Sequence, residues 1–167
     1  EKWGVEAGQL WRLGEHRLIC GDCTEELVVE KVVGSGIVKT VFTSPPYNMG
    51  GGMYKHYNDN LEDSEYIKLN LKSIENIIPH LKGFLFWNLS YNKNSRWEFI
   101  EVFYRIIRDS GLRFLELIVW DKGHGIPITS NDMLTRTYED ILIVSTDEVY
   151  RDIEFIEVMG TEKKAGF

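Results

Sequence analysis

The chain has only two cysteines and four prolines in its 167 residues. Two cysteines cannot form the disulfide framework of a small secreted domain, which favours a reduced, cytoplasmic setting. Cys20 and Cys23 make a Cys-x-x-Cys pair, which a redox pair or half of a zinc site would also use. A zinc site needs a second ligand pair, and the four histidines show no ligand spacing, so we expect no metal.

Basic residues are also scarce: 19 Lys and Arg stand against 26 Asp and Glu, a formal charge of −7. Proteins that grip nucleic acid through its phosphates usually carry a basic surface, so any such surface here is local or lies elsewhere. No apolar run approaches the roughly 20 residues of a membrane span and no signal peptide heads the chain, so we expect no membrane association. The content of 43% hydrophobic and 13% aromatic residues is typical of a folded domain.

One stretch combines a strand with a proline-stiffened loop. Residues 37–42 are apolar and β-branched, which predicts a buried strand, and the run stops at Ser44-Pro45-Pro46-Tyr47. Two successive prolines fix two φ angles near about −65° and remove two N–H donors. The loop therefore presents a hydroxyl, carbonyl acceptors and an aromatic ring at the carboxyl end of a strand, where α/β sheets bind ligands. These groups suit a planar molecule with an amino group, such as a nucleobase.

The remaining patterns alternate between strand and helix. Residues 8–21 predict a β-hairpin, followed by a turn at Gly21-Asp22-Cys23 and a helix that we expect Thr24 to cap. Further helices are expected over 63–78 and 95–109, and further strands over 83–89, 113–120 and 138–146. In the last helix the expected core face is Trp97, Ile100, Phe103, Tyr104 and Ile107. This order predicts an α/β fold with a parallel sheet and right-handed crossovers.

The loop Thr-Ser-Pro-Pro-Tyr-Asn over residues 43–48 resembles the catalytic loop of the DNA amino-methyltransferases, whose pattern is (Asp/Asn/Ser)-Pro-Pro-(Tyr/Phe/Trp). Members of this family move a methyl group from S-adenosylmethionine to the exocyclic nitrogen of cytosine or adenine. The resemblance implies a Rossmann-like methyltransferase sheet, S-adenosylmethionine as cofactor, and double-stranded DNA with a flipped base as substrate. It assigns catalysis to Ser44, Pro45, Pro46 and Tyr47. The alternative is a proline-stiffened surface turn.

The Gly-Asp-Cys segment before this loop is similar to the family segment that lies beside the cofactor's adenine. Carried over, Asp22 accepts a hydrogen bond from the adenine amino group and the Cys23 backbone N–H donates to the ring. Thr43 is also assigned to cofactor binding. Alternatively, Asp22 is an ordinary turn or capping residue.

Two further segments are assigned to the DNA. The glycine-rich loop after the prolines has a counterpart in many family members, and its candidate substrate residues are Asn48, Tyr54, Lys55 and Tyr57. Its tyrosines would stack on a base and its lysine would meet phosphate; alternatively it is a flexible insertion. The strand ending at Trp120 and Lys122 resembles the family segment that lines the pocket for the extruded base. The alternatives are a core tryptophan and a solvated lysine. Residues 138–144 resemble the family's (His/Tyr)-Glu-x-Ile-Leu-Val.

The sequence lacks the family's Phe-x-Gly-x-Gly loop, which cradles the methionine part of the cofactor. In one permuted class that loop follows the catalytic loop and the recognition region. We therefore interpret residues 1–167 as a single partial methyltransferase domain, the catalytic half only. A complementing C-terminal segment or a second copy of the chain is the expected partner.

The resemblance also implies a mechanism. The Ser44 hydroxyl and the Pro45 carbonyl accept the two N–H bonds of the amino group, which favours a pyramidal nitrogen with a usable lone pair. Tyr47 stacks on the base. Serine at the first motif position favours N4 of cytosine over N6 of adenine. The alternatives are an inactive fragment or regulatory DNA-binding module, and an RNA or protein amide methyltransferase, for which Asn is expected at position 44.

Overall fold

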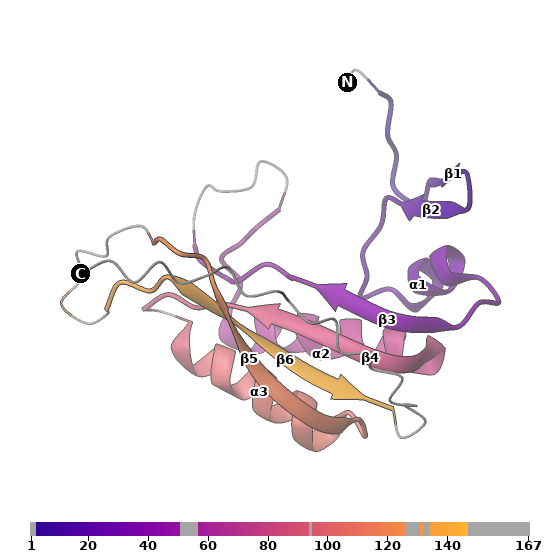
Figure 1. Cartoon of the computed structure of the whole chain (residues 1–167). Helices are drawn as coiled ribbons and strands as arrows, with labels where there is room; N and C mark the ends of the chain where they lie inside the picture. The colour runs from indigo at the N-terminus through magenta and orange to yellow at the C-terminus, as the bar shows by residue number, and fades with distance from the viewer. Residues whose placement is uncertain (1–2, 51–56, 94, 126–130, 132–133, 147–167) are drawn as a thin grey trace, which may run out of the picture.

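The computed structural model describes residues 3–50, 57–93, 95–125, 131 and 134–146. The chain begins with the expected hairpin, in which β1 (Leu10–Leu13) pairs antiparallel with β2 (His16–Ile19). This hairpin forms a small sheet of its own above a four-stranded sheet (Figure 1).

The larger sheet is mixed. Its strands are, in chain order, β3 (Val38–Thr43), β4 (Leu81–Leu89), β5 (Arg113–Asp121) and β6 (Tyr138–Ser145), and their spatial order is β3-β4-β6-β5. β3 and β4 are parallel, whereas β6 runs antiparallel to both β4 and β5. The prediction of a parallel sheet is therefore wrong for β6. Parallel neighbours need a crossover, usually helical, whereas antiparallel neighbours such as β5 and β6 can be joined by a loop alone.

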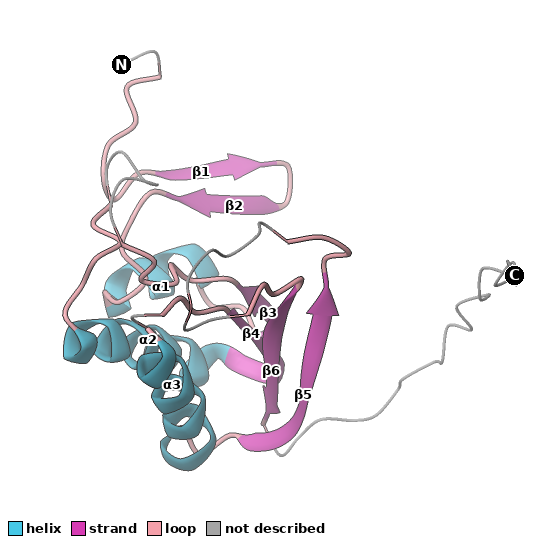
Figure 2. Cartoon of the chain, turned by 90° about the vertical axis from the view of Figure 1, so that its left-hand side faces the viewer, coloured by secondary structure: helices cyan, strands magenta, loops and turns pink. Residues whose placement is uncertain are grey.

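Three helices, α1 (Glu26–Val33), α2 (Asp63–Ile77) and α3 (Arg96–Asp109), lie on one side of the sheet (Figure 2). A single 3₁₀ turn, η1 (Ile78–His80), links α2 to β4. The core between helices and sheet is built from these buried side chains: Tyr66, Ile74, Leu85, Trp87, Leu89, Val102, Ile106, Leu142 and Val144. A buried amide serves this core, because Asn70 accepts a hydrogen bond from Trp87 Nε1 at 3.0 Å.

The helix α3 presents to the core a face that shares only Phe103 with the predicted one. Phe103 is buried as predicted, but Trp97 is 78% exposed and Ile100, Tyr104 and Ile107 are also exposed, while Val102 and Ile106 are buried instead. Both sets recur at helical spacing, so the sequence periodicity fits either face and contact with the sheet decides between them.

No described helix or strand covers the opposite face of the sheet (Figure 2). This face carries apolar side chains. The cross-strand register places Phe42 beside Phe86, with ring centroids 6.2 Å apart, and Phe84 is at the same distance from Phe86. Phe42, the penultimate residue of β3, is 62% exposed. We call this surface, with its three phenylalanines, the open face.

Thr24 does not cap α1 as predicted. Its hydroxyl and its backbone N–H both donate to Asp22 Oδ1, at 2.7 and 2.8 Å, and Glu25 occupies the N-cap position without a side-chain capping bond. The Asp22 side chain competes successfully for the Thr24 hydroxyl because Asp readily bonds to groups two residues ahead. Within the described ranges, no helix is long and apolar enough to cross a membrane.

Candidate active site

Four strand ends meet at one edge of the open face. Strands β3, β4 and β5 end there, and the antiparallel strand β6 begins there. Ser44 directly follows β3, Asn88 is the penultimate residue of β4, and Glu139 is the second residue of β6. The proline-stiffened loop is thus held at the carboxyl edge of the parallel pair, as its sequence predicted.

These residues form one hydrogen-bonded network with Tyr47. The Ser44 and Tyr47 hydroxyl oxygens are 2.5 Å apart, and Tyr47 donates to Glu139 Oε2 at 2.9 Å. Asn88 Nδ2 lies 2.9 Å from each of three acceptors, Ser44 Oγ, Tyr47 Oη and Glu139 Oε2. Asn88 is only 1% exposed, whereas Ser44 is exposed to solvent. We call Ser44, Tyr47, Asn88 and Glu139 the hydroxyl network.

Lys122 completes the network on its far side. Its ammonium donates to Glu139 Oε1 at 2.7 Å and forms an ion pair with that largely buried carboxylate. Burial alone would raise the pKa of Glu139, but the hydrogen bonds from Lys122, Asn88 and Tyr47 outweigh it and hold the pKa below its ordinary value of 4.5. Glu139 is therefore ionised at neutral pH.

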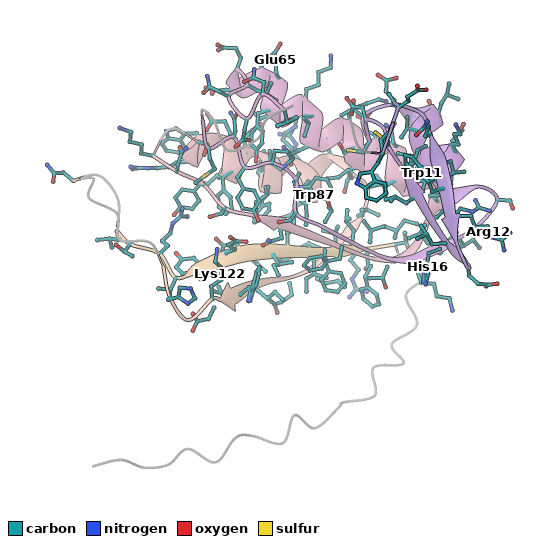
Figure 3. All side chains as sticks on the ribbon, turned by 90° about the horizontal axis from the view of Figure 1, so that it is seen from above. Trp11, Arg12, His16, Glu65, Trp87 and Lys122 are labelled. Carbon is teal, nitrogen blue, oxygen red and sulfur yellow. The ribbon has the colours of Figure 1, made fainter. Side chains whose placement is uncertain are left out.

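Trp120 lies beside this network. It is paired across the β5–β6 ladder with Glu139, so the two side chains are neighbours on the same face of the sheet. Its ring is 49% exposed, as a wall open to a ligand requires. Figure 3 shows Lys122 near one end of the molecule, with Arg12 and His16 of the hairpin near the other end and Trp87 between them.

The side chain of Asn48, which we assigned to substrate binding, bonds to the backbone of Leu61. Its side-chain amide donates to the Leu61 carbonyl at 3.0 Å and accepts from the Leu61 N–H at 2.7 Å. Asp59 accepts the Asn48 and Met49 backbone N–H groups at 3.0 and 3.1 Å. These contacts, which we call the loop clamp, fasten together the two ends of the loop that follows the prolines.

The other predicted residues of that loop are placed only in part. Tyr54 and Lys55 lie outside the described residues. Tyr57 is described and is 37% exposed. Their contacts with substrate stay predictions.

Two of the three residues assigned to the cofactor, Asp22 and Cys23, lie on a turn fixed to α2. Cys23 Sγ is 3.2 Å from Ser73 Oγ, and the Cys23 carbonyl accepts from Asn76 Nδ2 at 3.1 Å. Asp22 uses one carboxylate oxygen on Thr24 and is exposed. Thr43, the last residue of β3, pairs with Trp87 in the sheet. No described hydrogen bond links this turn to the hydroxyl network; both pack against α2, since the Tyr47 ring contacts the core that α2 helps to build.

Sequence reasoning gave no role to Asn88, Glu139 or Asp59. A usable signal existed for two of them, because Asn88 interrupts an apolar strand and Glu139 stands in the stretch that resembles the family's (His/Tyr)-Glu-x-Ile-Leu-Val. Asp59 gave no signal within a polar loop.

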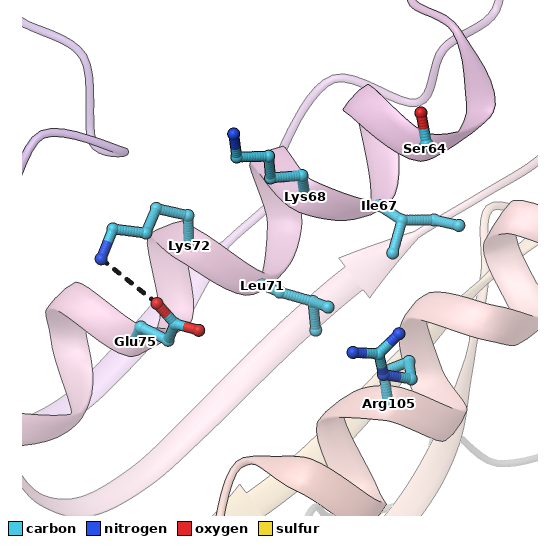
Figure 4. A pocket seen from close by; sticks show the side chains of 7 residues that line it. All are labelled: Ser64, Ile67, Lys68, Leu71, Lys72, Glu75 and Arg105. Carbon is cyan, nitrogen blue, oxygen red and sulfur yellow. Dashed lines mark hydrogen bonds and ion pairs between the residues drawn. The ribbon is translucent and has the colours of Figure 1, made fainter.

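A separate pocket of about 390 Å³ opens between α2 and α3 (Figure 4). It shares no residue with the hydroxyl network. Two of its three basic side chains pair with acids: Lys72 pairs with Glu75 at 3.2 Å, and Arg105 pairs with Asp109. In the described ranges, no group of three His, Cys, Asp or Glu side chains is arranged to hold a metal ion.

The class of protein follows from comparison with known families. The family model described as DNA methylase, for N6 and N4 methyltransferases, matches residues 38–165. The chain belongs to this DNA methylase family. The match includes the proline loop, Asn88, Trp120, Lys122 and Glu139.

Solved structures share the fold. The PvuII DNA methyltransferase, described as cytosine-N4-specific, superposes with a TM-score of 0.54 at 19% identity, over 74% of this chain and 47% of that one. A complex of M1.HpyAVI with S-adenosylmethionine gives a TM-score of 0.50 at 15% identity, over 77% and 54%. The chain thus spans about half the length of these structures. No curated protein matches its sequence significantly.

Proposed function

We propose that this chain supplies the base-binding half of an S-adenosylmethionine-dependent DNA methyltransferase. Its target is the exocyclic amino group of a base flipped out of double-stranded DNA, with N4 of cytosine preferred over N6 of adenine. The observation that supports it best is the exposed Ser44 hydroxyl, anchored by Tyr47 and Asn88 and followed by the Pro45 carbonyl. Hydrogen bonds within the described residues leave that carbonyl without a partner, so it is available as a second acceptor.

Ser44 and Pro45 act by orienting the amino group of the base. The amino group of cytosine is a weak nucleophile because its lone pair is delocalised into the ring. Two acceptors fixed by a rigid loop hold its N–H bonds in a geometry that favours a pyramidal nitrogen. Tyr47 or Trp120 supplies a surface for the base. S-adenosylmethionine, when bound, provides the electrophilic methyl group.

The cofactor's adenine fits the turn at Asp22 and Cys23. One oxygen of the Asp22 carboxylate and the Cys23 backbone N–H have no hydrogen-bond partner among the described residues, so an acceptor and a donor are available side by side. Calorimetric titration with S-adenosylmethionine tests this assignment. We expect the Asp22→Ala variant to bind at least about tenfold more weakly, on the scale of one hydrogen bond to a charged group.

The open face supports a further part of the proposal. The open face carries the exposed Phe42 with the partly buried Phe84 and Phe86 beside it, and among the described strands β3 forms an edge of the sheet. We propose that a complementing segment with the cofactor-binding half, or a second copy, covers it. Sedimentation analysis distinguishes the two: a dimer that Phe42→Lys dissociates supports the second copy, and a monomer supports the segment.

The catalytic assignment is tested by transfer of tritium from labelled S-adenosylmethionine to unmethylated DNA, with the complementing half added if the chain needs it. Ser44→Ala should lower kcat by about 100-fold or more, as loss of one preorganised group does elsewhere. Ser64→Ala, at an exposed position at the start of α2, is the matched control and should leave the rate unchanged. Equal rates for the Ser44 variant and the wild type would contradict the assignment.

A further inference from the structure

We propose that Glu139, ion-paired with Lys122, is a positioning residue that fixes the direction of the hydrogen bonds leading to Ser44. Ser44 then meets the substrate only as an acceptor. This inference rests on the proposed function and deepens it, because it names the chemical group that the site admits: an amino group and not a keto oxygen.

The direction of these hydrogen bonds follows from the Glu139 carboxylate. An ionised carboxylate can only accept hydrogen bonds, so the Tyr47 hydroxyl, 2.9 Å from Glu139 Oε2, must donate its single proton there. The same reasoning orients the amide of Asn88. Its Nδ2 and not its Oδ1 must face Glu139, because two oxygens without a proton would repel each other at 2.9 Å.

Ser44 is then left without a proton for the substrate. The Tyr47 proton is already committed to Glu139, so the short 2.5 Å contact between the two hydroxyls requires Ser44 to donate to Tyr47. Asn88 donates to Ser44 at 2.9 Å. A hydroxyl has one proton and two lone pairs, so Ser44 keeps one lone pair for a ligand. Because Ser44 is exposed, that lone pair can reach a ligand.

Lys122 keeps these hydrogen bonds in one direction. If Glu139 were protonated, it could donate to Tyr47 and Tyr47 could then donate to Ser44. The Ser44 proton would then turn toward the substrate. The 2.7 Å ion pair with Lys122 opposes that protonation. Lys122 thus acts on substrate choice through Glu139, from a position two residues beyond Trp120.

The direction of these hydrogen bonds predicts which bases the site binds. Cytosine and adenine present an amino donor where uracil and hypoxanthine present a keto acceptor. Facing the lone pairs of Ser44 and Pro45, a keto oxygen finds no donor, and sites built to hydrogen-bond one group reject the analogue without it strongly. If the hydrogen bonds that start at Glu139 ran in the opposite direction, the Ser44 hydroxyl would become a donor for the keto oxygen.

The first test measures binding of duplexes that carry cytosine or uracil at an unpaired position, with unlabelled competitor DNA. The wild type should prefer cytosine by roughly 10-fold or more. Glu139→Gln should reduce this preference to about threefold or less, because an amide can donate as well as accept. Asp140→Asn is the matched control: it removes the neighbouring carboxylate on the other face of the same strand and should keep the preference.

The second test needs no DNA and no catalysis. Carbon-13 NMR of glutamate-labelled protein follows the titration of Glu139. Its pKa should lie below 4.5 in the wild type, rise in Lys122→Met and return toward the wild-type value in Lys122→Arg. A wild-type Glu139 that titrates near neutral pH would overturn the inference whatever the enzyme does.

The two failures are separable. If the wild type prefers cytosine and Glu139→Gln keeps the full preference, the role of Glu139 is refuted while the proposed function stands. If the wild type shows no preference although Glu139 titrates as expected, the amino-acceptor site itself is refuted, and both proposals fall with it.

Discussion

Removal of the Asp59 carboxylate should destabilise the chain more than any ordinary loop substitution. Asp59 is only 5% exposed and accepts the backbone N–H groups of Asn48 and Met49. Asp59→Ala removes the acceptor of both donors. An unpaired buried donor costs roughly 1–3 kcal/mol, and the cost is smaller at Met49, which is 38% exposed, because water can replace the lost acceptor there. The Asn48 backbone is in the left-handed region, with φ 54°, and its conformation depends on this clamp. We expect a loss of about 1–3 kcal/mol in the free energy of unfolding.

Urea denaturation followed by circular dichroism measures this loss. Asn60→Ala is the matched control, because Asn60 is the exposed neighbour of Asp59 and should change stability by less than about 0.5 kcal/mol. Asp59→Asn should fall between the two, since its amide oxygen can replace one acceptor only. A loss below about 0.5 kcal/mol in Asp59→Ala would refute the loop clamp as a source of stability.

Three further substitutions test the packing around the site. Asn70→Ala should cost about 2–3 kcal/mol in urea denaturation, because it leaves the buried Trp87 indole N–H without its acceptor; a neutral result would contradict the role of that amide. Gly83→Ala should also destabilise, by about 1–3 kcal/mol, because an added Cβ would lie 2.0 Å from the Lys39 carbonyl oxygen; wild-type stability would show that β3 and β4 can separate there. Glu98→Gln should stabilise the chain near pH 7. Burial, with the Asp63 charge adding to it, raises the pKa of Glu98 above 4.5, so the cost of its charge is present above the folded-state pKa and vanishes below the unfolded-state value. The gain should therefore shrink as the pH is lowered toward 4 in the same assay, and a gain that grows instead would contradict the sign.

The local parts of the site could be predicted from the sequence. The strand before Ser44 and the stiff loop after it follow from a β-branched run and two prolines, which act within a few residues. The placement of that loop at the carboxyl edge of the sheet followed from the strand alone. Trp120 was found in the same way, as the end of an apolar strand.

The rest depended on contacts between distant segments. The hydroxyl network joins Asn88 to Glu139 across 51 residues and Tyr47 to Glu139 across 92. It forms because β6 runs antiparallel between β4 and β5, and the direction of a strand is not encoded in its own apolar pattern. The exposed face of α3 has the same origin: Trp97 and Val102 belong to competing apolar stripes, and only the sheet selects one.

The central claim is tested most directly by the identity of the nucleoside that receives the methyl group. Unmethylated DNA is incubated with deuteromethyl-labelled S-adenosylmethionine and the chain, with its complementing half if required, and the digested nucleosides are analysed by mass spectrometry. The account predicts labelled N4-methylcytosine, formed about 100-fold or more slowly by Ser44→Ala. Label in N6-methyladenine would contradict the base preference, and label in neither nucleoside, with the cofactor bound, would contradict the proposed function.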